Sequence, residues 1–215
     1  MQKVFYYTLN IIHFILYYYR TLKLFILLAL IFLILFSVFQ AAKSKESFGN
    51  QHYTYGILIC CYNRPEFLKK TFDSLKKSNL QNTMIYIIDD HSADETTTKM
   101  IDRFEIPGVE IIKERNRTNL GINDSMIKGF TFLYPKCEFL VTIDSDVELK
   151  PEWLIKLHQV YQEGKMAFPT ARDFLVTGFN CTSTCNHKIK KTYPNFHTKN
   201  TIGGINMFYH RNFFK

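Results

Sequence analysis

A chain of 215 residues is long enough for one domain with a substantial hydrophobic core. Its formal net charge of +8 arises from 27 Lys and Arg against 19 Asp and Glu. These cations are scattered, and no predicted element joins a basic face to interleaved aromatics, which excludes a dedicated nucleic-acid-binding module. A basic surface near anionic lipid or an anionic substrate explains the charge as well.

The first part of the chain is apolar and does not belong to that core. Leu24–Ala42 runs for 19 residues without a charge, and as a helix it would extend about 28 Å, close to the thickness of a hydrocarbon layer. A cleavable signal peptide is the competing interpretation because Ala41 and Ala42 are small, but its apolar region would be shorter. We therefore expect residues 1–42 to form a short N-terminal segment and a retained transmembrane anchor.

The charges around this stretch predict its orientation in the membrane. Lys3, Arg20 and Lys23 precede it, whereas Lys43 and Lys45 follow it, offset by Glu46. The small excess of positive charge before the stretch favours a cytosolic amino terminus. This predicts a single-pass type II protein whose soluble part faces the Golgi or ER lumen or another extracytosolic space. Val4–Tyr19 is also apolar, and it extends the membrane helix, lies in the interface or forms a second span; the sequence leaves these three open.

Cysteines and glycosylation sequons bear on the same question of compartment. Cys181 and Cys185 are close enough for a disulfide in an oxidising compartment, and a metal site with His187 is the rival interpretation. Three sequons fit a luminal domain, although such short patterns also arise by chance. They begin at Asn116, Asn123 and Asn180.

Residues 43–53 form a polar stem, and from residue 54 onward strands and helices alternate. Continuous apolar runs predict strands buried on both faces. They are Tyr55–Cys60, Met84–Ile88, Val109–Lys113 and Phe139–Ile143. Apolar residues at helical spacing predict helices that begin near Pro65, at Ser92 or Asp94, at Gly121 and at Pro151. This alternation predicts an α/β fold with a mostly parallel sheet flanked by helices.

The same spacing indicates which side chains face the core. In the helix near Pro65 they include Phe67, Leu68, Phe72 and Leu75, and in the helix from Gly121 they include Ile122, Met126, Ile127, Phe130 and Leu133. We also expect Trp153 to be buried in the core. Lys188–Lys191 is expected to be a solvated loop.

Three polar clusters follow three of the predicted strands. They are Cys61–Pro65, Asp89–Ser92 and Asp144–Asp146. Because residues i and i+2 of a strand point to one face, Asp144 and Asp146 would present two hard oxygen ligands together. The carboxyl ends of parallel strands meet at one edge of an open α/β sheet, where nucleotides bind. Each cluster alone reads as a turn, but three in register predict a nucleotide site with a divalent cation.

At these positions the chain resembles the inverting glycosyltransferases of the GT-A fold, family-2-like. The matching segments are Ile57–Pro65, Ile87–Ser92, Asn119–Gly121, Ile143–Asp146, Pro151–Leu154 and Gly203–Asn206. The resemblance covers about residues 54–215 and implies a GT-A (Rossmann-like) glycosyltransferase domain there. It implies transfer of a sugar from a nucleoside-diphosphate sugar to a hydroxyl of a glycan, lipid or protein acceptor.

The resemblance also implies roles for single residues. Asp146, with Asp144, would ligate Mn²⁺ or Mg²⁺ bridging the two phosphates. Cys60 and Tyr62 would line the base pocket, and Asp90 would contact the base or ribose. All residues expected to bind the nucleotide sugar are Cys60, Tyr62, Asn63, Arg64, Asp89, Asp90, Asn119, Gly121, Asp144, Ser145, Gly203 and Gly204. For Asn63 and Arg64, a strand-to-helix turn is an equally supported interpretation.

The catalytic base is the point at which the chain departs from the family pattern. Family members usually place an Asp or Glu base in the later half of the domain, and after Asp173 this sequence has no Asp or Glu. The sequence also stops soon after Gly203 and Gly204, where the family usually continues. The chain is therefore a shortened product, or a histidine takes the base role, or activity is lost. Asp173, His197 and His210 are candidates by residue type alone, against a loop cap or a surface histidine.

Two other functions stand beside a glycosyltransferase. The missing base favours a catalytically inactive nucleotide-sugar-binding protein or a truncated membrane partner protein. A nucleotidyltransferase on a related fold usually needs a Gly-rich phosphate loop after the first strand, and Cys60–Asn63 lacks the glycines.

Overall fold

The computed structural model of the chain describes residue 31 and residues 52–171, 173–178, 188–199, 201 and 205–214. The chain divides into two units, Met1–Gln51 and His52–Lys215, and only the second is described below. The predicted anchor and most of the stem lie outside the described residues, apart from the helical Ile31. Within the described ranges, no helix has both the length and the apolar character needed to cross a membrane.

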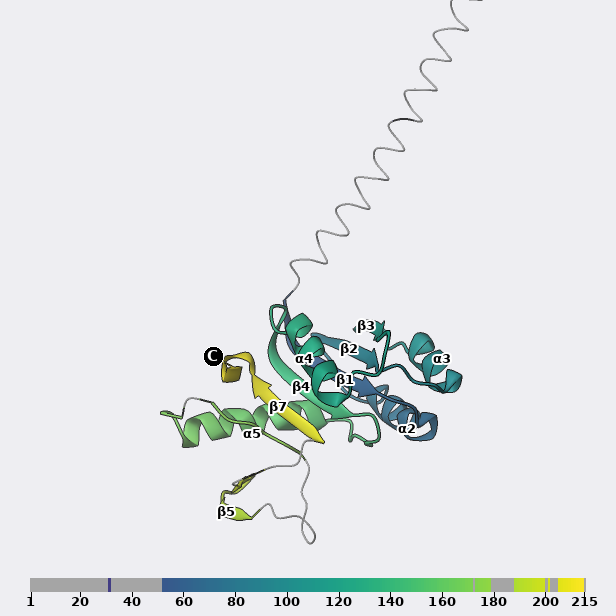
Figure 1. The fold of residues 1–215 in the computed structure, drawn as a ribbon. Coiled ribbons are helices and arrows are strands. Elements are labelled where there is room, and N and C mark those ends of the chain that lie inside the picture. The colour runs from purple at the N-terminus through teal and green to yellow at the C-terminus, as the bar shows by residue number, and fades with distance from the viewer. Residues whose placement is uncertain are drawn as a thin grey trace, which may run out of the picture. The chain divides into compact units, whose positions relative to one another are not determined.

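Five strands form the central sheet (Figure 1). They are β1 (Tyr53–Cys61), β2 (Thr83–Asp89), β3 (Glu110–Arg115), β4 (Cys137–Asp144) and β7 (Asn206–His210). Across the sheet the order is β3-β2-β1-β4-β7. The first four strands are parallel, and β7 runs antiparallel to β4. The predicted α/β fold with a mostly parallel sheet is therefore confirmed.

Helices connect the parallel strands and cover both faces of the sheet (Figure 1). They are α2 (Pro65–Leu75), α3 (Glu95–Arg103), α4 (Ile122–Leu133) and α5 (Trp153–Ala167), followed by a final 3-10 turn at Arg211–Phe214. Of the two predicted caps of α3, Asp94 is the one used, because its carboxylate accepts the N–H groups of Thr96 and Thr97.

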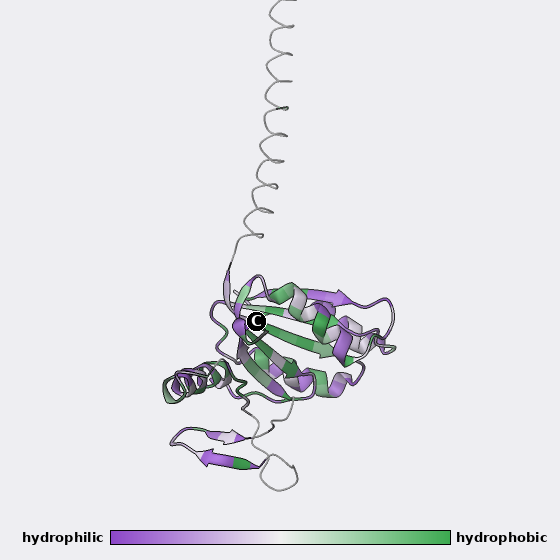
Figure 2. Cartoon of the chain, turned by 60° about the vertical axis from the view of Figure 1, so that its left-hand side comes forward, coloured by the Kyte–Doolittle hydropathy of each residue, from purple (hydrophilic) through white to green (hydrophobic). Residues whose placement is uncertain are grey.

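The hydrophobic core has one layer on each face of the sheet. Side chains of α2, α3 and α5 pack on one face against residues such as Ile57 and Val141, and α4 packs on the other against residues such as Leu58. Every residue of β2 is buried, as expected of a strand covered on both sides. Figure 2 shows the green, hydrophobic colour concentrated on these central strands. Trp153, 7% exposed, is in the core as predicted.

Three side chains that the helical spacing placed in the core lie on the surface instead. Phe67, Ile122 and Ile127 are 44%, 55% and 64% exposed. In α4 the buried stripe consists of Ser125, Gly129 and Leu133. Leu133 is buried, and Met126 and Phe130 pack against the core as predicted, so the prediction is wrong for Ile122 and Ile127 alone.

Gly129 allows α4 to approach β1 closely. A Cβ atom at residue 129 would lie 2.3 Å from Cδ1 of Leu58, whose side chain is fully enclosed. We predict that Gly129→Ala lowers the free energy of unfolding by about 1–3 kcal/mol, although alanine favours helix formation. Urea unfolding measures this, with Thr131→Ala on the exposed side of the same helix as the control. Equal stability of the two variants would contradict the close approach.

Two elements of the later part were not predicted from the sequence. β7 pairs with β4 on the side away from β1. A separate hairpin is formed by β5 (Ile189–Thr192) and β6 (His197–Lys199). The prediction that Lys188–Lys191 is a loop is therefore wrong for residues 189–191, although all three are exposed. Their backbone groups pair with β6, a long-range contact that the local sequence does not reveal.

Candidate active site

The register of the sheet brings the three polar clusters to one edge. Cys61 pairs with Asp89 of β2, and Cys60 pairs with Asp144 of β4. Cys60 lies among carboxylates: burial, then the charges of Asp90 and Asp144, raises the pKa of its thiol to about 12. The predicted convergence of the strand ends at the same edge is thus seen directly (Figure 1).

Asp144 and Asp146 form the accessible acidic part of this edge. Asp144 is half-buried, and burial together with the neighbouring charge of Asp146 raises the pKa of its carboxyl group to about 6. The Asp146 side chain is 42% exposed, and Nη1 of Arg64 lies 3.5 Å from its Oδ2. Two carboxylates that repel each other at an accessible position would gain from a cation between them.

The carboxylate oxygens at this edge fit a metal ion that is also bound by the phosphates of a ligand. Among the residues that the structure describes, no group of three or more His, Cys, Asp or Glu side chains could hold a metal ion alone. Mg²⁺, however, is usually held by one or two carboxylates together with substrate phosphates, and Mn²⁺ prefers the same hard oxygens. Asp144 and Asp146 supply those two carboxylates. Arg64 is exposed, so its ion pair with Asp146 competes only weakly.

Asp89 is buried and its carboxylate is engaged within the protein. It accepts hydrogen bonds from Ser92 N–H at 2.8 Å and from Thr98 Oγ1 at 3.1 Å, and Nε of Arg115 lies 3.7 Å away. These contacts hold the loop between β2 and α3 against its strand. A contact of Asp89 with the base or ribose stays a prediction.

Asp90 organises the loop that leads into α4. Its carboxylate accepts hydrogen bonds from Asn116 Nδ2 at 2.7 Å, Leu120 N–H at 2.9 Å and Gly121 N–H at 2.8 Å. Burial raises the pKa of Asp90, but these hydrogen bonds outweigh it and hold the pKa below its usual value. Gly121 has φ +79°, which favours glycine, and its N–H also donates to Asn119 Oδ1. Asn119 and Gly121 are thereby held beside Asp90.

Asn63 and Arg64 form the turn from β1 into α2. Both have positive φ values, 55° and 58°. The Asn63 side chain accepts the N–H groups of Ala93 and Asp94, at 2.9 and 3.2 Å. Asn63 thus has the structural role in the turn, whereas Arg64 faces Asp146 and remains a candidate ligand.

Two further predicted residues, Tyr62 and Ser145, are placed by their neighbours in the chain. Tyr62 follows Cys61 at the same edge and is 48% exposed, and Ser145 lies between the two aspartates of the β4 loop. Gly203 and Gly204 lie outside the described residues, as do the predicted Cys181–Cys185 disulfide and its rival site with His187.

Two of the three base candidates, Asp173 and His210, lie toward the amino end of β4, whereas Asp144 lies at its carboxyl end. His210 pairs with Phe139, five residues before Asp144 along β4, so roughly 16 Å separates their positions. Asp173 is within 3.8 Å of His210 and accepts a hydrogen bond from the Tyr161 hydroxyl. Asp173 and His210 thus contact each other away from the carboxyl end of β4, and a role of either as the catalytic base stays a prediction. His197 lies on β6, with Nδ1 3.2 Å from Thr192 Oγ1.

Two asparagines have roles that the site prediction missed. Asn116 is 3% exposed and contacts Asp90, Ser125 and Lys128, so this sequon cannot carry a glycan in the folded protein. Asn206 pairs with Ile143, directly before Asp144. Its Oδ1 is buried and has no hydrogen-bond partner among the residues that the structure describes. The sequence signal for Asn206 was its position two residues after Gly204, inside the segment Gly203–Asn206.

Comparison with known proteins agrees with this geometry. Residues 56–214 match the family model described as Glycosyl transferase family 2. The chain belongs to this family. Within it, 120 residues are 27% identical to the undecaprenyl-phosphate 4-deoxy-4-formamido-L-arabinose transferase of Enterobacter sp. (strain 638), over 54% of this chain and 36% of that protein. An uncharacterized glycosyltransferase of Haemophilus influenzae is 26% identical over 102 residues, 47% of this chain and 30% of that protein.

The chain thus spans about a third of the length of these curated relatives. Among solved structures, S. aureus TarS 1–349 is similar with a TM-score of 0.48 and 13% identity. That similarity covers 74% of this chain and 47% of TarS 1–349. The mannosyltransferase PcManGT from Pyrobaculum calidifontis, in complex with GDP-Man and Mn²⁺, has a TM-score of 0.38, 13% identity and coverage of 46% and 29%.

Proposed function

We propose that this family-2 protein transfers a sugar from a nucleoside-diphosphate sugar to an acceptor, with Mn²⁺ or Mg²⁺ and with inversion at the anomeric carbon. Family membership supports sugar transfer. The observation that carries the metal and the donor is the pair Asp144 and Asp146 at the carboxyl end of β4, beside the ends of β1 and β2. Ligands of open α/β sheets bind at such an edge.

Each residue at this edge would bind a different part of the donor. Asp144 and Asp146 would hold the cation, which when bound stabilises the diphosphate leaving group as a Lewis acid. Tyr62 would offer its exposed ring to the base. Asn206 Oδ1 would accept a hydrogen bond from a sugar hydroxyl, because it lies close to Asp144 and has no partner among the described side chains and backbone groups.

Thermal unfolding with nucleotides tests this proposal. The full chain is heated with uridine, guanosine, adenosine or thymidine diphosphate, each with and without Mn²⁺. A ligand that binds only the folded state stabilises it by about 2.7 kcal/mol at a hundred times its dissociation constant. We expect one of these nucleotides to raise the unfolding temperature by several degrees only when Mn²⁺ is present. If none does so under either condition, the donor assignment is wrong.

A nucleotide-sugar-binding protein without catalysis is the second candidate. It is favoured by the position of Asp173 and His210, which leaves two of the three base candidates at the far edge of the sheet. Calorimetry separates the two functions: binding of the donor with Mn²⁺, with neither hydrolysis nor transfer of the sugar, supports this one.

The apolar stretch Leu24–Ala42 motivates a further part of the proposal, a type II membrane protein that contacts lipid through this anchor. Resistance to alkaline carbonate extraction and protection of the soluble part from added protease in sealed vesicles are the expected results. Release by carbonate would contradict the anchor.

A further inference from the structure

An exposed ion pair connects α2 to the acidic part of the candidate site. Nη1 of Arg64, at the start of α2, lies 3.5 Å from Oδ2 of Asp146 in the loop after β4. The two side chains are 67% and 42% exposed, so a ligand can reach both. Within the described part of the chain, Asp146 is the only charged partner of this guanidinium. Most of its five N–H donors are therefore available to a further anion.

The backbone that carries Arg64 is held in a conformation that residues with a side chain rarely adopt. Asn63 and Arg64 have φ values of 55° and 58°, which are unfavourable for any residue except glycine. Hydrogen bonds from the loop between β2 and α3 maintain this turn: Asn63 N–H donates to Ser92 Oγ, and the Asn63 side chain accepts from Ala93 and Asp94. The turn in turn directs the guanidinium toward the loop after β4.

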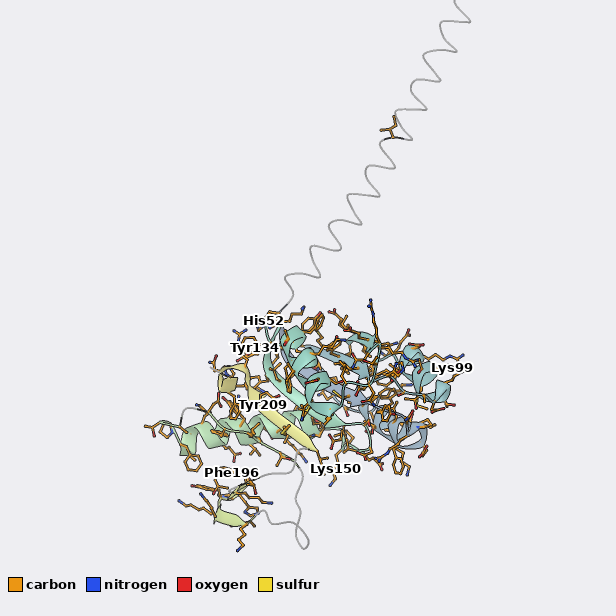
Figure 3. The ribbon with its side chains drawn as sticks, viewed as in Figure 1. His52, Lys99, Tyr134, Lys150, Phe196 and Tyr209 are labelled. Atoms are coloured by element: carbon orange, nitrogen blue, oxygen red, sulfur yellow. The ribbon has the colours of Figure 1, made fainter. Side chains whose placement is uncertain are left out.

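The loop that carries Asp146 is attached to the same helix. Val147 N–H donates to Oγ1 of the buried Thr71 of α2, at 3.1 Å. Lys150, later in this loop, lies at the end of the domain opposite His52 (Figure 3), as expected for the carboxyl end of β4. Because the backbone is held on both sides of the ion pair, rotation of the side chains alone is enough to break it.

The ion pair places a positive charge where the proposed cation would bind. A guanidinium and a divalent cation at the same carboxylate of Asp146 would repel each other, so the cation should displace Arg64. The displacement is easy because exposed ion pairs are weak. The other anion that the proposed function brings to this edge is the diphosphate of the donor. A guanidinium matches the geometry of phosphate oxygens with two parallel N–H donors.

We propose that Arg64 exchanges between two partners and thereby couples the binding of the cation to the binding of the nucleotide. Without ligands it is the counter-ion of Asp146, and when the cation binds to Asp146 it moves to the diphosphate. The cation thus releases a group that strengthens nucleotide binding. A nucleotide that arrives without a cation meets two carboxylates and an arginine that is still paired. This regulation rests on the proposed function, because it needs both ligands at this edge.

Arg64→Gly is the variant that tests the exchange. Glycine adopts a φ of 58° without strain, so the guanidinium is removed without disturbing the turn, and the unfolding temperature should stay equal or rise. Arg103→Ala is the matched control, since it removes the charge of another exposed arginine, in the last turn of α3. Both variants are made in the full chain.

Titration calorimetry should show effects of opposite sign on the two ligands. Arg64→Gly should bind Mn²⁺ alone about two- to fivefold more tightly than the wild type, because an exposed competing charge is gone. At saturating Mn²⁺ it should bind the nucleoside diphosphate that stabilises the wild type about tenfold or more weakly, because a charge-assisted hydrogen bond is lost. Arg103→Ala should change neither affinity.

A second variant separates charge from geometry. Arg64→Lys keeps the positive charge but lacks the two parallel donors, so it should bind Mn²⁺ as the wild type does and bind the nucleotide with an affinity between those of the wild type and Arg64→Gly. Unchanged or weaker Mn²⁺ binding by Arg64→Gly would overturn the exchange. If Arg64→Gly binds the nucleotide as tightly as the wild type, the proposed function stands and the exchange alone is wrong. If no nucleoside diphosphate binds the wild type with Mn²⁺, the proposed function fails and the exchange fails with it.

Discussion

Asp146→Ala should reduce sugar transfer by about a thousandfold or more. The proposed cation stabilises the diphosphate leaving group by several kcal/mol, and Asp146 is its more exposed carboxylate ligand. The second readout is independent of turnover: the Mn²⁺-dependent rise in unfolding temperature with nucleotide should disappear. Initial rates of sugar transfer and thermal unfolding measure the two effects.

The control for this variant is Asp102→Ala, which removes an exposed carboxylate from the end of α3. It should leave both readouts unchanged. Since Asp146 is exposed and its ion pair with Arg64 is long, its removal should change the stability of the unliganded protein by less than about 1 kcal/mol. Full activity of Asp146→Ala at limiting Mn²⁺ would show that the cation binds elsewhere.

The second large effect is expected from Asp90→Ala, on stability. This change removes the acceptor of three donors, of which the one on Asn116 is buried and those on Leu120 and Gly121 are partly buried. The expected loss is about 3–5 kcal/mol in the free energy of unfolding, or roughly 10 °C in the unfolding temperature. Urea unfolding and calorimetry measure it. Asp124→Ala, on the exposed surface of α4, is the control and should lose less than about 0.5 kcal/mol.

The stability difference between the wild type and Asp90→Ala should depend on pH through the pKa of Asp90. Its pKa in the folded protein lies below the usual value, so its contribution is present in full above about pH 4 and is lost as the pH falls through the lower folded-state value. The stability difference between the wild type and Asp90→Ala should therefore shrink below about pH 4. A difference that grows in acid would contradict the hydrogen bonds assigned to this carboxylate.

The sequence predicts the first half of this domain well because its signals there are local. Buried parallel strands such as Met84–Ile88 are continuous apolar runs, and Asp94 is recognisable as a helix cap. The polar clusters after β1, β2 and β4 meet at one edge because parallel strands place their carboxyl ends together. Order along the chain was therefore enough to predict that these three clusters meet.

The remaining features depend on contacts between distant residues. β7 and the hairpin are short strands whose partners are fixed only in the folded chain. The buried face of α4 is set by the close approach of Gly129 to β1, which hydrophobic spacing does not show. Asp173 and His210 resembled base candidates by residue type, but the direction of β7 takes His210 to the opposite edge.

That direction of β7 has a consequence for how such proteins diversify. Because β7 is antiparallel to β4, the connection from Asp144 to Asn206 is an insertion that starts and ends at the same end of these two strands. Evolution can lengthen, shorten or replace this insertion while the parallel strands keep their alignment. New acceptor preferences would then arise without rebuilding the half of the protein that carries the proposed nucleotide site.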